Sequence, residues 1–171
     1  RYIWIDAAAN FPDFANSKEN IARDLALAKD AGFTDIVVDV RPTTGDVLFK
    51  TNLVDQVKFM YAWIGSNYTK VERTATWDYL QAFVDEARKQ GLRIHAAINT
   101  FVGGNQIDGG TGLLYRDQSK AEWATQMNMQ VGITSVMNTS ESTKFFNPAH
   151  PEVQTFLCDL LKDLAGYDLD G

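Results

Sequence analysis

Five polar side chains stand near the ends of short apolar segments, and their types suit chemistry on a polar ligand: Asp6, Asp39, Arg41, His95 and Asn99. Asp6, Arg41 and Asn99 close their segments, whereas Asp39 and His95 lie one layer deeper. Carboxylate, guanidinium, imidazole and amide groups together donate and accept hydrogen bonds, which suits a ligand rich in hydroxyl groups. The alternative is a buried network in which Arg41 pairs with Asp6 or Asp39 and serves only stability.

Three amphipathic helices are expected to connect these segments, because apolar residues recur at helical spacing. The helices are predicted over about Ser17–Ala31 with Ser17 as the N-cap, from about Thr76, and from Pro151 with His150 as the cap. A glycine follows each helix and suits a left-handed C-terminal cap: Gly32, Gly91 and Gly166.

Short apolar segments alternate with the helices and are predicted to be strands: Tyr2–Asp6, Phe33–Val40, Leu92–Ile98 and the segment from Tyr167. Strands that alternate with helices predict a parallel sheet with right-handed crossovers. Each of the first three segments has one aliphatic face and one face with polar groups, whereas an open doubly wound sheet is apolar on both faces. The pattern therefore favours an α/β fold of the parallel (β/α)8 TIM-type barrel class, with the polar face inside.

Chain length bears on this barrel, because a complete one typically needs about 250 residues. The chain has 171 residues and ends as a fourth strand begins. We therefore expect residues 1–171 to be the incomplete N-terminal portion of a single barrel domain, with three β/α units and the start of strand four. An open sheet edge exposes unpaired backbone groups, so the remainder of the barrel, or self-association, is expected to cover it.

Two long connections, Pro42–Ala75 and Thr100–His150, follow predicted strand ends, where parallel β/α proteins place their ligand sites. Flat aromatic rings can pack against the apolar faces of sugar rings, although most aromatic side chains in these connections are expected to be loop core. These residues are Phe49, Phe59, Tyr61, Trp63, Tyr68, Phe101, Tyr115 and Trp123.

Composition excludes several classes of function. The net charge of −6 argues against a nucleic-acid partner, which needs clustered basic residues. No stretch is long and apolar enough for a transmembrane segment. The single cysteine, Cys158, excludes an internal disulfide and is predicted to be buried. The two histidines, His95 and His150, lack a carboxylate at metal-ligand spacing, and the glycine pairs lack the context of a dinucleotide loop, so no metal or cofactor is expected.

Several segments in this order resemble the glycosyl-hydrolase-like family 10 group of glycosidases, and the resemblance covers nearly the whole chain. The segments are Tyr2–Ala7, Val38–Pro42, Arg93–Asn99, Asn147–Val153 and Tyr167–Gly171. The segment Asn147–Val153 with Tyr167–Gly171 behind it is the most specific of them. The resemblance implies a (β/α)8 barrel that hydrolyses glycosidic bonds, in an exported (periplasmic, cell-surface or secreted) protein of a polysaccharide-degrading bacterium.

Glycosidases generally need two carboxyl groups, and in the family the segment that ends at Gly171 continues into a strand with a further acidic residue. The catalytic pair is therefore expected beyond Gly171, so that this fragment alone is inactive. No catalytic residue is assigned, and the five polar residues named above are expected to bind a carbohydrate substrate. Two alternatives remain: a carbohydrate-binding barrel without catalysis, and a metal-dependent sugar isomerase-like barrel with Asp39 and His95 as ligands.

Overall fold

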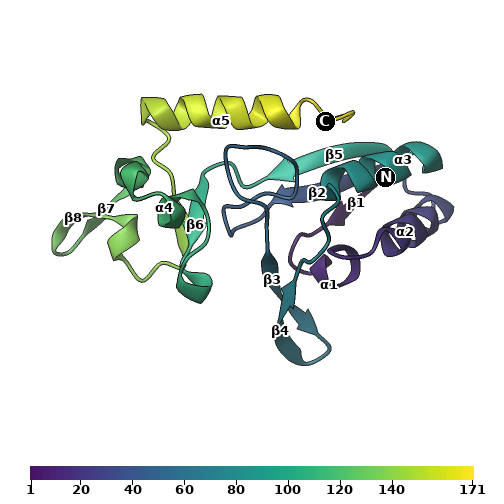
Figure 1. The fold of residues 1–171 in the computed structure, drawn as a ribbon, viewed down its shortest axis with the longest axis horizontal. Coiled ribbons are helices and arrows are strands. Elements are labelled where there is room, and N and C mark those ends of the chain that lie inside the picture. Colours follow the sequence, from purple (N-terminus) through teal and green to yellow (C-terminus); the bar gives the residue numbers. More distant parts are fainter.

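A three-stranded parallel sheet lies at the centre of the computed structural model, which describes residues 1–171 (Figure 1). Its strands are β1 (Tyr2–Ile5), β2 (Asp35–Arg41) and β5 (Arg93–Ile98), in the order β1-β2-β5. The register pairs Ile3 with Ile36 and Ile36 with Ile94, so aliphatic side chains of neighbouring strands lie side by side. The predicted parallel arrangement of these three segments is present.

Two helices cover the aliphatic face of this sheet. Helix α2 (Lys18–Asp30) begins at Ser17, whose side chain accepts a hydrogen bond from the backbone N–H of Asn20, as predicted for the cap. Helix α3 (Tyr79–Gln90) packs beside α2 and against β2 and β5. It begins at the cap Asp78, a little later than predicted, and ends at Gly91 in the left-handed conformation. A short helix, α1 (Phe11–Phe14), precedes α2.

Helix α5 (Pro151–Leu164) runs along one side of the molecule, across both the sheet and the segments that follow it (Figure 1). The His150 ring accepts a hydrogen bond from the backbone N–H of Glu152, which confirms the predicted cap. Gly166, in contrast, does not adopt the predicted left-handed conformation. Residues from Tyr167 form no strand, but the Asp170 N–H donates to the carbonyl of Ile94 alongside β5.

The two long connections contain secondary structure of their own, and each strand pair in them is antiparallel. Between β2 and α3 lies the hairpin of β3 (Phe59–Ile64) and β4 (Asn67–Glu72). Between β5 and α5, strand β6 (Val102–Asn105) pairs with β9 (Thr143–Phe145), and β7 (Gln126–Met129) pairs with β8 (Gly132–Ser135). Four short helical segments complete this region: η1 (Ile107–Gly109), α4 (Leu113–Arg116), η2 (Gln118–Trp123) and η3 (Val136–Asn138).

The predicted parallel barrel is therefore wrong. The sheets have only two or three strands and most of them are antiparallel, so the fold is mixed α/β without a barrel pattern. The prediction extended the alternation of strands and helices to a fourth strand, but the residues from Tyr167 form no strand, and the two long connections form small sheets of their own. Local hairpins formed there instead, as in β3–β4, where a two-residue turn with Gly65 at φ +60° joins the strands.

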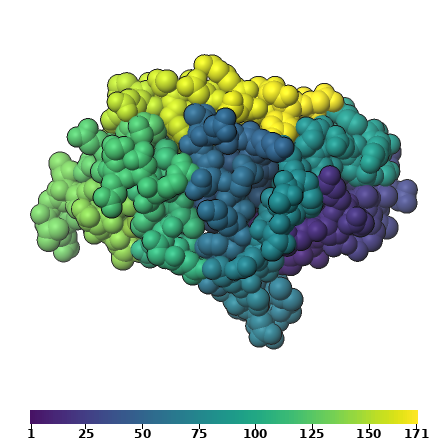
Figure 2. Space-filling model, viewed as in Figure 1, coloured from purple at the N-terminus to yellow at the C-terminus, as the bar shows by residue number.

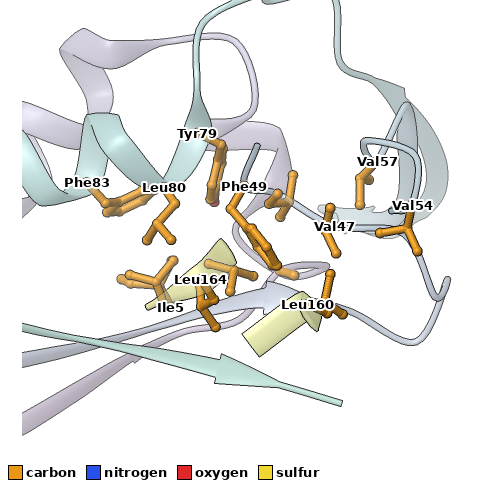
Figure 3. Packing of buried hydrophobic residues seen from close by; sticks show 14 of the residues in the cluster. Ile5, Val47, Phe49, Val54, Val57, Tyr79, Leu80, Phe83, Leu160 and Leu164 are labelled. Carbon is orange, nitrogen blue, oxygen red and sulfur yellow. The ribbon is translucent and has the colours of Figure 1, made fainter. Parts of the chain in front are cut away.

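The hydrophobic core joins the sheet to the connections. Figure 3 shows Phe49, from the connection after β2, between Tyr79 and Leu80 of α3 and Leu160 and Leu164 of α5. Burial of apolar surface is the main favourable contribution to folding. The connection after β2 is consequently held as firmly as the sheet, and it can position side chains for a site.

Candidate functional site

A cavity of about 380 Å³ opens at the carboxyl ends of β1, β2 and β5. Ligand sites of parallel α/β sheets lie at this end. Three of the five predicted residues, Asp6, Asp39 and Asn99, contribute to its walls. The other lining residues are Trp4, Ala8, Pro42, Thr43, Met60, Ala97 and Ile98.

Asp39 lies on the wall of this cavity, partly buried, on the non-aliphatic face of β2. Burial and, to a smaller degree, the nearby Asp6 carboxylate raise the pKa of its carboxyl group to about 6. The backbone N–H of Arg41 donates to Asp39 Oδ1 at 3.2 Å and lowers the pKa in part. Asp39 is consequently a carboxyl group that exchanges a proton near neutral pH.

Asp6 follows the end of β1 and is held by the turn that it begins. Its Oδ1 atom accepts hydrogen bonds from the N–H groups of Ala8 at 2.9 Å and Ala9 at 2.7 Å. Its own N–H donates to Asn10 Oδ1 at 3.0 Å. These hydrogen bonds hold the carboxyl group in one orientation. The turn therefore fixes a second carboxyl group beside Asp39.

Asn99 follows β5 and faces the same cavity. Its side-chain Nδ2 and its backbone N–H both donate to the carbonyl of Arg41, at 2.9 Å and 3.0 Å. This pair of bonds orients the amide, while its Oδ1 atom makes no hydrogen bond within the chain. Asn99 can therefore accept a hydrogen bond from a hydroxyl group in the cavity.

Arg41 does not reach the cavity, because the register between β2 and β5 shifts between Asp39 and Arg41. Its side chain is fully buried, and burial lowers the pKa of its guanidinium to about 10. The guanidinium donates to the backbone carbonyls of Asn99, Thr100 and Val102. Arg41 thus fixes the backbone that follows β5 and supports the cavity wall from behind.

His95 lies toward the opposite end of the sheet from the cavity. Its Nε2 atom is 2.9 Å from Oδ1 of the buried Asp35, which also accepts two hydrogen bonds from Arg93. Asp39 and His95 are therefore not neighbours in a common metal site. No group of three or more His, Cys, Asp or Glu side chains in the structure is placed to hold a metal ion.

Trp4 and Met60 are two large side chains of the cavity that were not among the predicted site residues. Trp4 shares a strand face with Asp6, as the period-two alternation of β1 predicts, and its side chain is 58% exposed at the cavity. Met60 comes from β3 and could not have been found without the hairpin.

Another cavity is larger, at about 670 Å³, and lies between residues 50–58, residues 73–78 and α5. Its acidic groups already have partners. Asp78 caps α3 and accepts a hydrogen bond from the Tyr167 hydroxyl, and Asp163 accepts one from Thr51. We therefore place the candidate site at the strand ends, where Asp39 has no side-chain partner.

The structure has no helix with the length and apolar character required to cross a membrane.

Comparisons with known proteins agree with the resemblance seen in the sequence. The family model described as "Glycosyl hydrolase-like 10" matches residues 1–171. An S-layer-related protein of Niallia circulans is 29% identical over 175 residues, which are 99% of this chain and 10% of that protein. The chain thus spans about a tenth of the length of this curated relative.

A solved structure is also similar to the chain. It is described as the crystal structure of a hypothetical protein from Ruminiclostridium thermocellum ATCC 27405, and it aligns with a TM-score of 0.58 and 14% sequence identity. The alignment covers 99% of this chain and 72% of that one. At this identity the likeness concerns the fold alone.

Proposed function

Because this chain belongs to the glycosyl hydrolase-like 10 family, we propose that the strand-end cavity binds a carbohydrate and that its two aspartates act on a glycosidic bond. This proposal departs from the expectation that the catalytic pair lies beyond Gly171, and the geometry around Asp39 is the reason for it. The observation that carries the proposal is Asp39. Its carboxyl group lines the cavity, has no side-chain partner, and has a pKa of about 6 beside a second carboxylate, Asp6. Glycosidases use two such groups in different protonation states.

In the proposed reaction Asp39 is the general acid. Its carboxylic acid donates a proton to the glycosidic oxygen while the bond from that oxygen to the anomeric carbon breaks, so the leaving group departs as an alcohol. The Asp6 carboxylate faces the positive charge that develops on the sugar ring. Water then forms the new bond to the anomeric carbon and gives its proton to the Asp39 carboxylate, which restores the carboxylic acid. A pKa near the working pH suits such proton transfer.

Ligand recognition rests on the remaining walls of the cavity. Trp4 offers an exposed indole face, and the face of an aromatic ring carries the negative part of its quadrupole. The C–H groups of a sugar ring are complementary to it. Asn99 Oδ1 accepts from a sugar hydroxyl, while Arg41 acts only through the backbone carbonyls that it holds.

The test uses the full chain and a panel of aryl glycosides with good and poor leaving groups. A general acid matters when the leaving group is poor and matters little for dinitrophenyl glycosides, which depart without protonation. Asp39→Asn should therefore lower turnover of poor leaving groups by about 10²- to 10⁴-fold and spare the dinitrophenyl substrates. An equal loss with both kinds of substrate would remove Asp39 from the role of acid.

A second candidate is carbohydrate binding without catalysis at a cell surface. The name of the relative, S-layer-related protein, favours it. Under this alternative the full chain binds oligosaccharides in calorimetry, Trp4→Ala weakens the binding, and no glycoside of the panel is hydrolysed. Export of the chain, which the name of the relative also favours, is part of both proposals and is checked by fractionating the cells that produce it.

A further inference from the structure

The β3–β4 hairpin projects from the body of the molecule (Figures 1 and 2) and exposes aromatic side chains on one face. Tyr61 and Trp63 share this face because they are two residues apart on β3, and Tyr68 on β4 pairs directly with Trp63. Trp63 is 68% exposed and Tyr68 is 57% exposed. Exposed aromatic surface of this kind marks an interaction site.

The aromatic rings of this face are held in place by each other and by a neighbouring segment. Tyr61 stacks on Tyr68 with the ring centres 5.4 Å apart, and Trp63 lies 5.3 Å from Tyr68. The Tyr61 hydroxyl donates to Asp108 Oδ1 at 3.0 Å, and Lys70 forms an ion pair with Asp108 at 2.7 Å. The face is therefore ordered before any ligand arrives, which lowers the cost of binding.

The aromatic rings are not needed for the core. The opposite face of β3 supplies the buried residues of the hairpin, Met60 and Ala62, and Met60 reaches the strand-end cavity. The hydrogen bond to Asp108 gives Tyr61 a structural role. The exposed ring faces of Trp63 and Tyr68 pack against no part of the core and are not explained by such a role. The hairpin thus has one side toward the candidate site and one side toward solvent.

A second, polar cavity lies at the foot of the aromatic face. It measures about 290 Å³, and it is lined by Phe59 of β3 and by Gly109, which follows Asp108. Its polar wall includes Thr44, Asp46, Asp55, Tyr115 and Arg116. Burial and the nearby Asp55 raise the pKa of Asp46 to about 6, so its carboxyl group both donates and accepts hydrogen bonds near neutral pH.

We infer that Trp63, Tyr68 and this polar cavity form a second carbohydrate site, which holds a neutral polysaccharide chain outside the cavity of Asp39. The rings pack against the apolar faces of successive sugars, and the polar wall forms hydrogen bonds with their hydroxyl groups. The inference rests on the proposed function only for the class of ligand. A neutral polymer is specified because the chain carries a net charge of −6 and because two of the three local cations, Lys70 and Arg116, are already paired with Asp108 and Asp55. The third cation, Lys58, lies on the cavity wall near the Asp46 carboxyl group.

The experiment measures retention of the full chain on insoluble cellulose, xylan and chitin. The wild type should bind at least one of them, and added salt should have little effect because these polymers are neutral. Trp63→Ala should weaken binding by about tenfold, the loss expected for one aromatic stacking contact. Trp63→Phe should retain most of the binding, because it keeps a flat ring.

Ile64→Ala is the matched control, because Ile64 is the next residue and is 48% exposed on the opposite face of the hairpin. It should bind like the wild type. Trp63→Leu separates stacking from general hydrophobic contact, and its binding should fall as in Trp63→Ala. Unchanged melting temperatures establish that each variant is folded.

Three outcomes would overturn the inference: no retention of the wild type on any of the three polymers, equal binding by Trp63→Leu and the wild type, or a loss of self-association in Trp63→Ala. The last result would make the aromatic face a contact between copies of this chain. Failure of the proposed function is distinguishable, since Asp39→Asn should keep polymer retention and Trp63→Ala should keep turnover of short soluble glycosides.

Discussion

Strand β2 carries an aspartate near each of its ends, and the surroundings of the two carboxyl groups differ. Asp35 accepts hydrogen bonds from Arg93 at 2.7 Å and 2.8 Å and from Thr34 at 2.6 Å, with His95 at 2.9 Å. These partners, Arg93 foremost, hold its pKa well below the usual range. Asp35 thus holds β2 and β5 together.

Asp39, on the same strand, has a backbone N–H and a neighbouring carboxylate in place of cations. Its pKa is therefore raised to about 6. The pKa of a buried aspartate on this strand thus depends on its partners more than on its burial. Cationic partners make Asp35 a stabilising group, and their absence leaves Asp39 ready to transfer a proton.

The largest expected effect comes from replacing the Asp39 carboxyl group, and it tests the different roles of Asp39 and Asp35. Asp39→Asn should lower turnover of unactivated glycosides by about 10²- to 10⁴-fold and leave the fold intact, because Asn keeps the acceptor for the Arg41 N–H. Asp35→Asn should do the reverse: it lowers the melting temperature and spares the turnover of the folded protein. Kinetics and thermal unfolding of both variants check this, and an interchange of the two results would refute the division of roles.

The next effect concerns Arg41, which supports the cavity without lining it. Arg41→Met removes the guanidinium donor from the carbonyls of Asn99, Thr100 and Val102, of which Asn99 keeps the Val102 N–H, and should cost roughly 3 kcal/mol of the free energy of unfolding. Denaturant titration measures it. Arg23→Met is the control, because Arg23 is exposed and paired with Asp24 on the surface of α2, where such changes cost less than about 0.5 kcal/mol. Weaker sugar binding with unchanged stability would instead place Arg41 at the ligand.

A smaller effect follows from pH. The folded state binds the Asp39 proton more tightly than the unfolded state, so stability falls as pH rises between about 4 and about 6. Asp46 has a pKa raised to about 6 and acts in the same direction. Asp39→Asn should therefore be more stable than the wild type above about pH 7, by roughly 2 kcal/mol. Denaturant unfolding across this range checks the prediction, and identical pH profiles for both proteins would contradict it.

The three strands of the sheet that carries the site could be predicted from the sequence. Alternation along the three segments correctly separated the aliphatic face, with Ile36, Val38 and Ile94 buried, from the face that carries Asp39. Helix caps at Ser17 and His150 were also predictable, because they depend on local hydrogen bonds.

Features that depend on distant contacts could not be predicted. The register shift between Asp39 and Arg41 arises from the pairing of β2 with β5, and it buries a side chain that alternation alone would point into the cavity. The Arg41 bonds to carbonyls beyond β5 are likewise visible only in three dimensions. Cys158 was predicted to be buried from its apolar neighbours but is exposed, because it lies off the apolar stripe of α5.

The most direct measurement is an NMR titration of the aspartate side-chain carboxyl groups, with and without an oligosaccharide that the chain binds. We expect Asp39 to titrate near pH 6, as its raised pKa of about 6 requires, and its signal to shift when the sugar is added. Asp35 should remain ionised at the lowest pH at which the chain stays folded, and the sugar should leave its signal unchanged. An Asp39 carboxyl that titrates in the ordinary aspartate range, or that ignores every bound sugar, would contradict the assignment of this cavity as the site.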